Sequence, residues 1–473
     1  MVRLLSPVGG GLFLALLGVF GVAYRRRRNG GDNKNTRAGA RGGSRAHKGK
    51  GKPHKLSDGG GDGLKSGGSS SAGGGSSSFV EARDNVALQL TPALKPRTAQ
   101  IKLATDVVMG CSTLAGMFTA LPEGDAVKTV EAALLAGIKT FDTAPHYGLG
   151  LSEERLGRAL AMLSTIAKLT PGKVQVWTKV GRVIYDSSRG ETAPKDADVE
   201  HGNMAGNPGC IFPETSKTRT PVLDYTADGV RRSFHDSQRR LRLEPDNLSG
   251  KVSGRNSPGL VERNVLLTDS GIVGVRVHDA ETEERFAAAM KPGSGAVDGM
   301  VQLRKEGLLT NVSIGMNDAS YVLRMIEGKP NGTFNSVMLA GSWNLLDQSG
   351  LGVLKACDAR NIEVHNAGVF ASGLLVGGST YRYSKAPPEM VAKTERWGKL
   401  AAKFAVPLPA VALHFAFAPA VVSKVAVGLK TPAEVESTKR WLSTAIPAAL
   451  WSEAKTAGLL DAACPTPGSI HAR

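Results

Sequence analysis

The sequence is poor in cysteine, and its few cysteines form no recognisable ligand set. The 473 residues include four, Cys111, Cys210, Cys357 and Cys464, and they are far apart with no CxxC or CxxH spacing. This pattern argues against a zinc site and against a disulfide framework, so we expect ordinary thiols and no bound metal. A hydrophobic content of 41% allows a large core, either in two to four domains or in one large barrel with appendages.

Acidic residues are nearly absent from the first 78 residues, where 14 Lys or Arg stand against three Asp, a net charge of +11. Because the whole chain carries +17, the remaining 395 residues carry only +6. They form a mildly basic body, and nothing in them indicates nucleic-acid binding. Residues 25–78 are basic and rich in Gly and Ser, with too few apolar side chains to offset the entropy of ordering. We expect this segment to be disordered.

Residues 4–24 form an apolar run followed by four arginines. The run is long enough to cross a bilayer as a helix, and the arginines after it would keep the rest of the chain on the cytosolic side. One interpretation is therefore a membrane anchor with a cytosolic catalytic domain. A second is a cleaved signal peptide at residues 1–24 followed by a transit-like segment at 25–78, as for a plastid bounded by extra membranes. The third is a fortuitously apolar start.

From residue 100 onward, short apolar strands alternate with amphipathic helices. The expected strands are 106–111, 140–143, 174–180, 274–278, 311–315, 336–340, 362–367 and 424–428. The expected helices are 126–136, 152–161, 227–243, 298–306, 319–327, 352–360, 390–405 and 432–441. Eight such pairs predict an α/β fold of the (β/α)8 barrel type within residues 79–473. A doubly wound sheet is the alternative, but the first strand-to-helix turn lacks a GxGxxG pattern.

Two polar segments rich in Gly and Pro interrupt this alternation, and we interpret both as long loops on the barrel. Residues 189–221 follow the third strand, on the side where barrel enzymes build their pockets. Residues 245–269 precede the fourth strand, at the opposite face by topology. We therefore expect the first insertion to affect specificity and the second to have no part in catalysis.

The segment FDTAPHYGLGLSEERLG, residues 141–157, places an acid and a phenol five positions apart where a strand ends and a helix begins. Asp142 closes the strand, and Tyr147 lies in a turn rich in glycine. Ser152 is interpreted as the N-cap of the helix, with Glu153 and Glu154 in its first turn. Functional side chains often lie on such loops above a rigid scaffold.

Two further residues come from the next two strands of the predicted barrel. Lys179 lies in an apolar strand and needs a partner, and Asp142 on the neighbouring strand is the obvious candidate. A cation near Tyr147 would favour the phenolate and lower the pKa of the phenol, which makes Tyr147 a usable acid and base. His278, in GVRVHDAE, could orient the same substrate oxygen.

These residues resemble the aldo-keto reductase family, whose catalytic tetrad is an Asp, a Tyr, a Lys and a His on consecutive barrel strands. The resemblance is to the branch of D-threo-aldose, L-fucose and L-galactose dehydrogenases, and it covers roughly residues 100–442. It continues through MGCSTLAG, WTKVGR, LDYTADGVRRSFHDSQRRL, VHDAE, IGMND, VMLAGSWNLLDQ, NAGVFASGLL and VGLKTPAEVEST. It implies that Tyr147 is the general acid and base, that Lys179 lowers its pKa, that Asp142 pairs with Lys179 and that His278 orients the substrate.

The resemblance also implies a nicotinamide cofactor without a Rossmann turn. Asn317 would hold the carboxamide and Trp343, where relatives usually carry Tyr, would stack on the nicotinamide. The other implied contacts are Val369, Phe370, Ser372, Gly373 and Leu374 for the pyrophosphate and Gly428, Lys430 and Glu434 near the adenosine end. Glu434 stands where many NADP-dependent relatives place an Arg, so we expect NAD to be preferred over NADP, although Lys430 nearby weakens this argument.

The leading functional hypothesis is an NAD-dependent aldose 1-dehydrogenase that removes the C1 hydrogen of a pyranose lactol as hydride, while Tyr147 takes the hydroxyl proton, and gives an aldonolactone. A general aldehyde or ketone reductase is the alternative within the enzyme class. A nucleotide-sensing regulatory subunit at a membrane, reached through residues 4–24, is the alternative outside it. A further possibility is that the basic N-terminal segment docks the chain on anionic lipid or nucleic acid.

Overall fold

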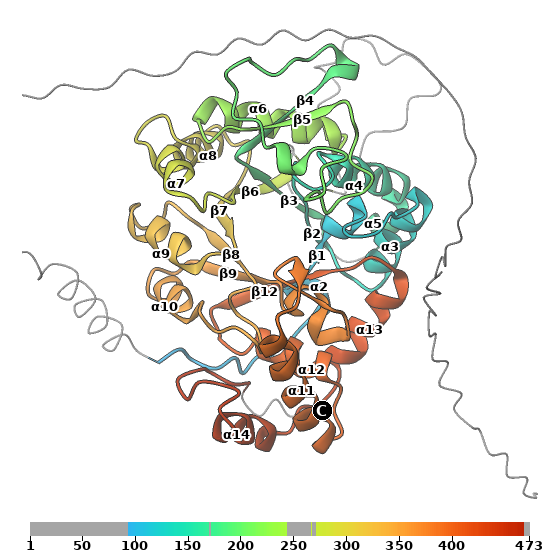
Figure 1. Cartoon of the computed structure of the whole chain (residues 1–473), viewed down its shortest axis with the longest axis vertical. Coiled ribbons are helices and arrows are strands. Elements are labelled where there is room, and N and C mark those ends of the chain that lie inside the picture. The colour runs from blue at the N-terminus through green and yellow to red at the C-terminus, as the bar shows by residue number, and fades with distance from the viewer. Residues whose placement is uncertain (1–92, 170–171, 244–265, 267–270, 468–473) are drawn as a thin grey trace, which may run out of the picture. The chain divides into compact units, whose positions relative to one another are not determined.

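The computed structural model describes residues 93–169, 172–243, 266 and 271–467. Parallel strands close into a barrel whose order around the ring is β1, β12, β9, β8, β7, β6, β3 and β2 (Figure 1). Their bounds are β1 Val107–Gly110, β2 Thr140–Asp142, β3 Gln175–Val180, β6 Ile272–His278, β7 Asn311–Met316, β8 Ser336–Ala340, β9 Glu363–Ala367 and β12 Val422–Gly428. Each overlaps one expected strand, so the predicted (β/α)8 fold is confirmed.

Helices alternate with the strands and surround the barrel (Figure 1). They are α2 Leu103–Asp106, α3 Glu123–Leu135, α4 Leu151–Met162, α5 Ser164–Leu169, α6 Ala227–Arg240, α7 Glu283–Met290, α8 Ala296–Lys305, α9 Ala319–Glu327, α10 Leu351–Ala359, α11 Pro388–Lys403, α12 Leu408–Ala416, α13 Pro432–Leu442 and α14 Ala448–Thr456. Proline begins α11 and α13, where the missing N–H costs nothing. Helix α3 begins three residues before the expected start, with Glu123 and Asp125 in its first turn.

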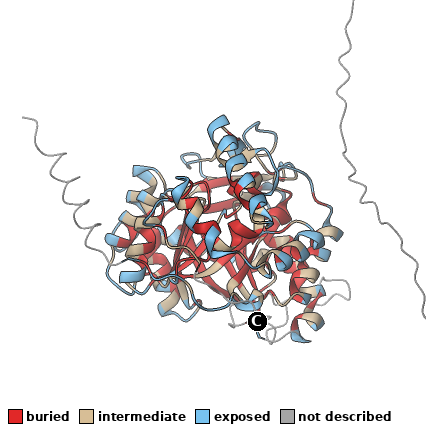
Figure 2. Cartoon of the chain, turned by 90° about the horizontal axis from the view of Figure 1, so that it is seen from below, coloured by how far each residue is buried: buried red, intermediate tan, exposed pale blue. Residues whose placement is uncertain are grey.

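The main core lies between the strands and the inner faces of the helices, and Figure 2 shows the strands buried while the outer helix faces are exposed. A separate small apolar cluster is formed by Val108, Met338 and Ala426, on β1, β8 and β12. The barrel strands also bury charged side chains, among them Lys179 on β3 and Arg276 on β6. Buried charges require partners, and these partners define the site described below.

The insertion after β3 begins and ends in an antiparallel hairpin. Its strands are β4 (Arg182–Asp186) and β5 (Arg219–Leu223), joined through the short turns η2 (Ser187–Arg189) and η3 (His201–Asn203). The segment between these two strands lies where the loop at 189–221 is expected, and the last residues of that range belong to β5. Of the second predicted loop, 245–269, only Leu266 belongs to the described residues, and it forms an isolated bridge with Val174.

The predicted N-terminal segments, residues 4–24 and 25–78, lie outside the described residues and remain predictions. Within the described part of the chain, no single helix is long and apolar enough to cross a membrane. Helices α11 and α12, which meet at a bend of 102°, are together long and apolar enough to cross a membrane, by length and composition alone.

Candidate active site

The carboxylate of Asp142 is the buried charge centre of the site. It ends β2, and its Oδ1 accepts a hydrogen bond from the ammonium of Lys179, which also donates to the carbonyl of Thr143 at 2.8 Å. Its Oδ2 accepts from Nε of Arg276 at 2.9 Å. Burial alone would raise the pKa of Asp142, but the two cations outweigh it and hold the pKa below its ordinary value. The expected pairing of Asp142 with Lys179 is therefore present, and Arg276 is an unexpected third member.

Arg276 has no exposed surface, and all its nitrogens have partners. Nη1 donates to Oγ of Ser313 at 2.6 Å and Nη2 to Nδ1 of His365 at 2.7 Å. The guanidinium also lies 4.1 Å from the ring centroid of Trp177, a cation–π distance. Burial and the charge of Arg276 lower the pKa of His365 to about 4, so this imidazole is neutral and can accept the hydrogen bond. Arg276 thus ties β6 to β2, β7 and β9 inside the barrel.

Tyr147 is placed by a turn that only glycine-rich sequence can make easily. Gly148, Leu149 and Gly150 all have left-handed backbones, with φ of 62°, 51° and 94°. A Cβ on Gly150 would stand 2.5 Å from Cδ of Arg240, so this glycine is needed for space as well as conformation. The turn leaves Tyr147 half-buried at the barrel mouth.

The ammonium of Lys179 lies 4.8 Å from the ring centroid of Tyr147. The expectation that this cation lowers the pKa of Tyr147 is nevertheless wrong for the structure as it stands. Burial raises the pKa of the phenol well above its ordinary value, and the carboxylates of Asp142 and Asp279 raise it further. The charge of Arg276 lowers this pKa, but burial and the two carboxylates outweigh it.

His278 ends β6 and is held on several sides. Its carbonyl accepts a hydrogen bond from the hydroxyl of Tyr225 at 2.7 Å, and its Nδ1 lies 3.3 Å from Nη1 of Arg182. Its Nε2 lies 3.4 Å from a carboxylate oxygen of Asp279. Burial lowers the pKa of His278 well below its ordinary value, and the charge of Arg182 acts in the same direction against that of Asp279. The imidazole is therefore neutral, and its ring centroid lies 6.0 Å from that of Tyr147.

Two aromatic neighbours of Tyr147 were not predicted. His146, the preceding residue, has its ring centroid 6.1 Å from that of Tyr147 and 5.8 Å from that of His278. Phe212 comes from the insertion and lies 5.9 Å from Tyr147 and 5.8 Å from His146, between ring centroids. His146 could have been noticed from its place beside the phenol, whereas Phe212 carries no local signal in the sequence.

A second charge cluster, Arg182 with Glu200 and Asp279, borders His278 and was also not predicted. Arg182 begins β4 and is 4% exposed, and its guanidinium forms two hydrogen bonds of 2.7 Å with the carboxylate of Glu200 from the insertion. Its Nη1 lies 3.0 Å from Oδ2 of Asp279. Two carboxylates therefore share one cation, and this side of the mouth carries a net negative charge.

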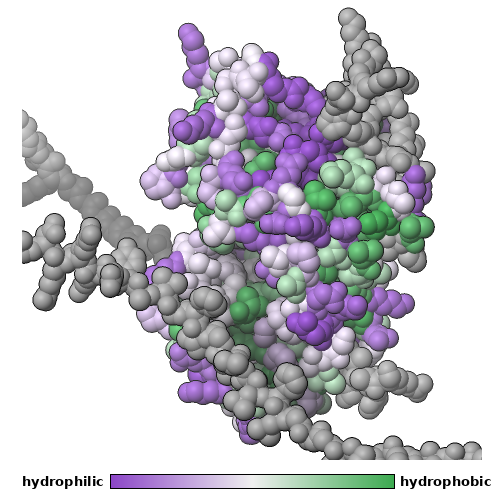
Figure 3. Space-filling model, turned by 90° about the vertical axis from the view of Figure 1, so that its right-hand side faces the viewer, coloured by the Kyte–Doolittle hydropathy of each residue, from purple (hydrophilic) through white to green (hydrophobic). Residues whose placement is uncertain are grey.

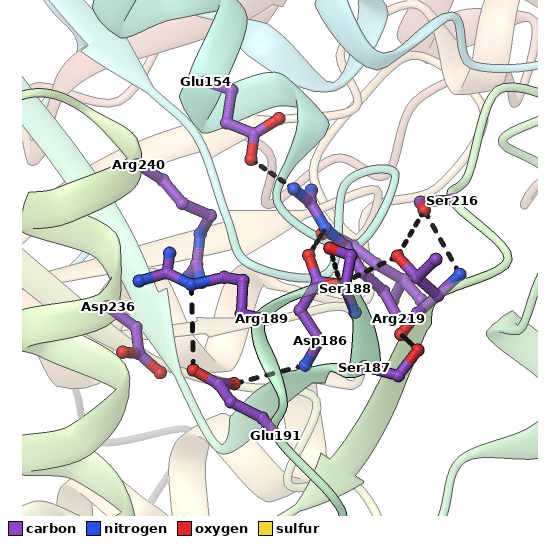
Figure 4. A network of polar contacts seen from close by, with 12 residues as sticks. Glu154, Asp186, Ser187, Ser188, Arg189, Glu191, Ser216, Arg219, Asp236 and Arg240 are labelled. Carbon is purple, nitrogen blue, oxygen red and sulfur yellow. Dashed lines mark hydrogen bonds and ion pairs between the residues drawn. The ribbon is translucent and has the colours of Figure 1, made fainter.

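The base of the insertion is fastened to the barrel by arginine–carboxylate contacts. Figure 4 shows Arg219 between the carboxylates of Asp186 and Glu154, and its Nε lies 3.0 Å from Asp186. Nη1 of Arg219 also donates to the carbonyl of Leu149 at 2.9 Å, within the turn that follows Tyr147. On another side, Arg155 of α4 pairs with Glu214 of the insertion at 2.9 Å. The insertion is thus part of the structure around Tyr147.

The interpretation of Ser152 as an N-cap is wrong. Helix α4 begins at Leu151 after Gly150, and the hydroxyl of Ser152 instead donates to the carbonyl of Cys111 at 2.6 Å. Glu153 has no exposed surface and accepts hydrogen bonds of 2.6 Å from Thr178 and Arg240. The acids of SEER lie in the first turn of α4, as expected, and they also fasten α4 to β3, α6 and β5.

The two residues expected to contact the nicotinamide differ in accessibility. Asn317 is half-buried just after β7, its backbone N–H donates to Glu281 and its carbonyl accepts from Ser342. Within the described part of the chain its side-chain amide makes no hydrogen bond, so its donor and acceptor are free for a carboxamide. Trp343 has no exposed surface and stacks on Phe415 at 5.0 Å between ring centroids. A nicotinamide ring could reach Trp343 only if this side chain moved.

The segment expected to cover a pyrophosphate contains the turn η5 (Ala371–Val376). Ala371, Ser372 and Gly373 have left-handed backbones, and the small hairpin of β10 (Thr380–Tyr381) and β11 (Ser384–Lys385) holds Ser372 through Thr380 Oγ1 and the N–H of Tyr383. The neighbouring side chains of the predicted set, Val369 and Leu374, are buried, and Phe370 packs its ring against Trp441.

Glu434 and Lys430, which are expected near the adenosine end of the cofactor, form hydrogen bonds within the protein. Glu434 accepts a hydrogen bond of 2.6 Å from the backbone N–H of Lys430 and completes a capping arrangement with Thr431 at the start of α13, just after Gly428. The ammonium of Lys430 donates to Thr119. The carboxylate of Glu434 thus faces the backbone of Lys430.

Across the expected cofactor residues, the amide of Asn317 and the η5 turn are chemically suited to a dinucleotide.

Together, Asp142, Tyr147, Lys179 and His278 bring a phenol, a neutral imidazole and a buried ion pair to one end of the barrel. A phenol whose proton can be exchanged beside a neutral hydrogen-bond donor is suited to general acid and base chemistry at a single oxygen of a ligand. Among the described residues, no group of three or more His, Cys, Asp or Glu is arranged to hold a metal ion.

The aldo/keto reductase family model matches residues 106–457. D-threo-aldose 1-dehydrogenase from Pseudomonas sp is 30% identical over 380 residues, 79% of this chain and 99% of that protein. Pyridoxal 4-dehydrogenase from Microbacterium luteolum is 29% identical over 362 residues, 76% of this chain and 95% of that protein. L-galactose dehydrogenase from Arabidopsis thaliana is 24% identical over 337 residues, with coverages of 70% and 82%. The solved holo form of an aldo-keto reductase from Bacillus halodurans shares the fold, with a TM-score of 0.51 at 17% identity and coverages of 80% and 100%.

Proposed function

The chain belongs to the aldo/keto reductase family, and from this premise we propose that it is an NAD(P)-dependent dehydrogenase that oxidises the C1 hydroxyl of a cyclic aldose to a lactone. The observation that carries the proposal is the meeting of Tyr147 with a neutral His278 and the buried Lys179–Asp142 pair. Two similar proteins named as sugar dehydrogenases support the choice of substrate class.

In the proposed oxidation, the C1–H bond breaks and the hydrogen leaves with its electron pair, while the hydroxyl proton passes to the oxygen of Tyr147. A bound nicotinamide dinucleotide supplies the hydride acceptor. Tyr147 accepts this proton as a phenolate, whose formation the charge of Arg276 favours and the burial of the ring opposes. The neutral imidazole of His278 donates a hydrogen bond to the same substrate oxygen and orients it. Arg276 keeps Asp142 ionised, so that Lys179 stays charged and fixed.

The reverse reaction, reduction of an aldehyde or ketone, is a second candidate that one observation favours. The raised pKa of Tyr147 keeps the phenol protonated near neutral pH, which is the form that acts as an acid. Because the same groups serve both directions, the candidates differ in the direction of turnover and in the substrate. They do not differ in which residues react.

For the cofactor, we propose that the amide of Asn317 binds the carboxamide and that the η5 turn covers the pyrophosphate. We further propose that NAD is preferred, because the carboxylate of Glu434 would repel the 2′-phosphate of NADP. The preference is measured as the ratio of kcat/KM for the two cofactors. A ratio of about tenfold in favour of NADP would overturn this part of the proposal.

The experiment that tests the function is a turnover assay of the full chain with NAD and with NADP. The substrates are L-fucose, L-galactose, D-arabinose, pyridoxal and simple aldehydes, each assayed in the direction its chemistry allows. Oxidation of at least one aldose, with a lactone identified as product, supports the proposal. Turnover of simple aldehydes alone would favour the reductase instead.

The matching variant is Tyr147→Phe, which keeps the ring and removes the hydroxyl. Turnover should fall by about 10²–10⁴-fold, the usual contribution of a positioned acid or base, while dinucleotide affinity stays unchanged. Tyr185→Phe, on β4, is the control, because its ring packs against Arg232 away from the tetrad. Full activity in Tyr147→Phe would defeat the assignment.

A further inference from the structure

His146 is a titratable residue that the tetrad does not use. It follows Pro145 and precedes Tyr147, so the turn that places the phenol also places this imidazole. The ring centroids of His146, Tyr147 and His278 form a triangle with sides of 6.1, 6.0 and 5.8 Å. His146 therefore stands as close to the two groups that would hold the reacting hydroxyl as they stand to each other.

The imidazole of His146 has a buried nitrogen without a hydrogen-bond partner. Within the described residues its Nδ1 makes no hydrogen bond, and Oε2 of Glu200 lies 4.0 Å away, beyond hydrogen-bond distance. The side chain is only 15% exposed. Buried polar atoms in native proteins nearly always have partners, and an unsatisfied one is costly. This nitrogen faces Glu200 and has almost no accessible surface, so a ligand group would meet the other ring nitrogen, Nε2, which is not among the buried unpaired atoms of the described residues.

The protonation state of His146 suits recognition of a hydroxyl. Burial, together with the charge of Arg182, lowers its pKa to about 4 against the opposing effect of Asp279 and Glu200. The neutral ring has one donor and one acceptor, as a hydroxyl does. Two carboxylates, Glu200 and Asp279, and two cations, Arg182 and Lys179, act on this imidazole, so the charge around it gives no preference between a neutral and an anionic substrate group.

The insertion holds this imidazole in place. The ring of Phe212 meets that of His146 edge to face, with an interplanar angle of 87°. Phe212 is 3% exposed, and it also contacts Tyr147. The insertion therefore supplies the wall against which His146 packs, and the two contacts limit the directions in which the imidazole can turn.

We propose that His146 is a specificity-determining residue that hydrogen-bonds the substrate hydroxyl on the carbon next to the one oxidised. The inference rests on the proposed function. When Tyr147 and His278 hold the hydroxyl that is oxidised, the hydroxyl on the adjacent carbon faces the third ring, that of His146. The substrate class is thus an aldose with a free 2-hydroxyl, and 2-deoxy analogues are disfavoured.

The test compares kcat/KM for an accepted aldose with that for its 2-deoxy counterpart, using the full chain. The wild-type protein should prefer the 2-hydroxy sugar by about 10- to 100-fold, the worth of a hydrogen bond to a group otherwise left unpaired. In His146→Phe this ratio should fall to near one, chiefly through loss of kcat/KM for the 2-hydroxy sugar. His146→Asn, which keeps a donor and an acceptor, should retain part of the preference.

The matched control is His201→Phe, a histidine exposed on the insertion itself, which should leave the ratio unchanged. Thermal unfolding and dinucleotide binding confirm that His146→Phe is folded. A wild-type ratio near one, or an unchanged ratio in a folded His146→Phe, would overturn the inference.

A second arm separates this inference from the proposed function. It measures the reduction of glyceraldehyde and of 3-hydroxypropanal, which differ only in that glyceraldehyde carries a hydroxyl on the carbon next to the carbonyl. If no aldose is oxidised but wild type prefers glyceraldehyde and His146→Phe does not, the sugar function fails and the role of His146 stands. If neither sugars nor these aldehydes are turned over, the inference is overturned as well.

Discussion

At the scale of single residues, the site depends on a charge balance inside the barrel. Asp142 is shared between Lys179 and Arg276, and Arg276 is in turn fixed by Ser313 and His365. The argument that a charged strand residue needs a partner predicted the first pair. The same argument applies to Arg276 in GVRVHDAE, but only the closed barrel shows that both cations meet one carboxylate.

Replacement of Arg276 by Met should be strongly destabilising. It leaves His365 and Ser313 without their donor and weakens the neutralisation of Asp142, and breaking a buried charge pair costs about 3–5 kcal/mol. The control is Arg231→Met, whose guanidinium is 41% exposed in its pair with Glu306 and should contribute less than about 1 kcal/mol. Denaturant unfolding measures both, and equal small effects would contradict this account of the barrel interior.

The raised pKa of Tyr147 gives opposite pH profiles for the two directions. Oxidation uses the deprotonated phenol, whose fraction grows with pH as long as the pH is below the pKa, so kcat/KM for oxidation should rise from pH 6 to pH 9. Reduction uses the protonated phenol, which is already fully populated, so its profile should be flat over the same range. Initial rates in both directions check this, and an oxidation profile that falls with pH would contradict it.

At the scale of elements, the turn between β2 and α4 decides where the phenol stands. The glycines at 148 and 150 are turn signals in the sequence, but three successive left-handed residues are not predictable from it. The sequence predicts Ser152 as the cap because serine followed by two acids is typical of a helix start, whereas the turn lets the helix begin at Leu151. The polar side chains after the turn, in residues 152–155, form hydrogen bonds with other elements. Its spacing gave no sign of those partners.

Gly150→Ala should damage the turn. A Cβ there meets Arg240 at 2.5 Å, and a left-handed alanine costs about 1–2 kcal/mol, so both stability and turnover should fall. Gly398→Ala, inside α11 with open space around it, is the matched control and should be neutral or stabilising by about 0.5–1 kcal/mol. If the two substitutions had the same effect on turnover, the role given to the turn would be wrong.

At the scale of the whole molecule, the acid limit of stability should reflect buried neutral histidines. The folded-state pKa values of His146 and His365 are about 4, below their ordinary value of 6.5. Between pH 6.5 and 4 these histidines are protonated in the unfolded chain but not in the folded one. The free energy of unfolding therefore falls as the pH is lowered from about 6.5 to 4, by up to about 3 kcal/mol for each group. Unfolding measured against pH should show a smaller loss in His146→Phe than in wild type, and identical slopes would contradict the assignment.

The surface and the chain outside the barrel are further features at this scale. The face in Figure 3 is largely hydrophilic with scattered apolar areas. Three of the most exposed apolar side chains in the described structure are Leu135 on α3, Met162 on α4 and Leu169 on α5. The predicted anchor at residues 4–24 and the basic segment at 25–78 stay predictions, since the described structure begins at residue 93.

The sequence by itself determined the barrel and the tetrad, because both depend on local periodicity and on strand order. Alternating strands and helices can close in few ways, and residues at the ends of consecutive strands must meet. Only the tertiary structure decided the sign of the pKa shift of Tyr147, since that sign depends on burial and on every nearby charge. It also brought Glu200 and Phe212, which follow 54 and 66 positions later in the chain, to His146. Folding of the insertion creates this proximity, and no spacing in the sequence predicts it.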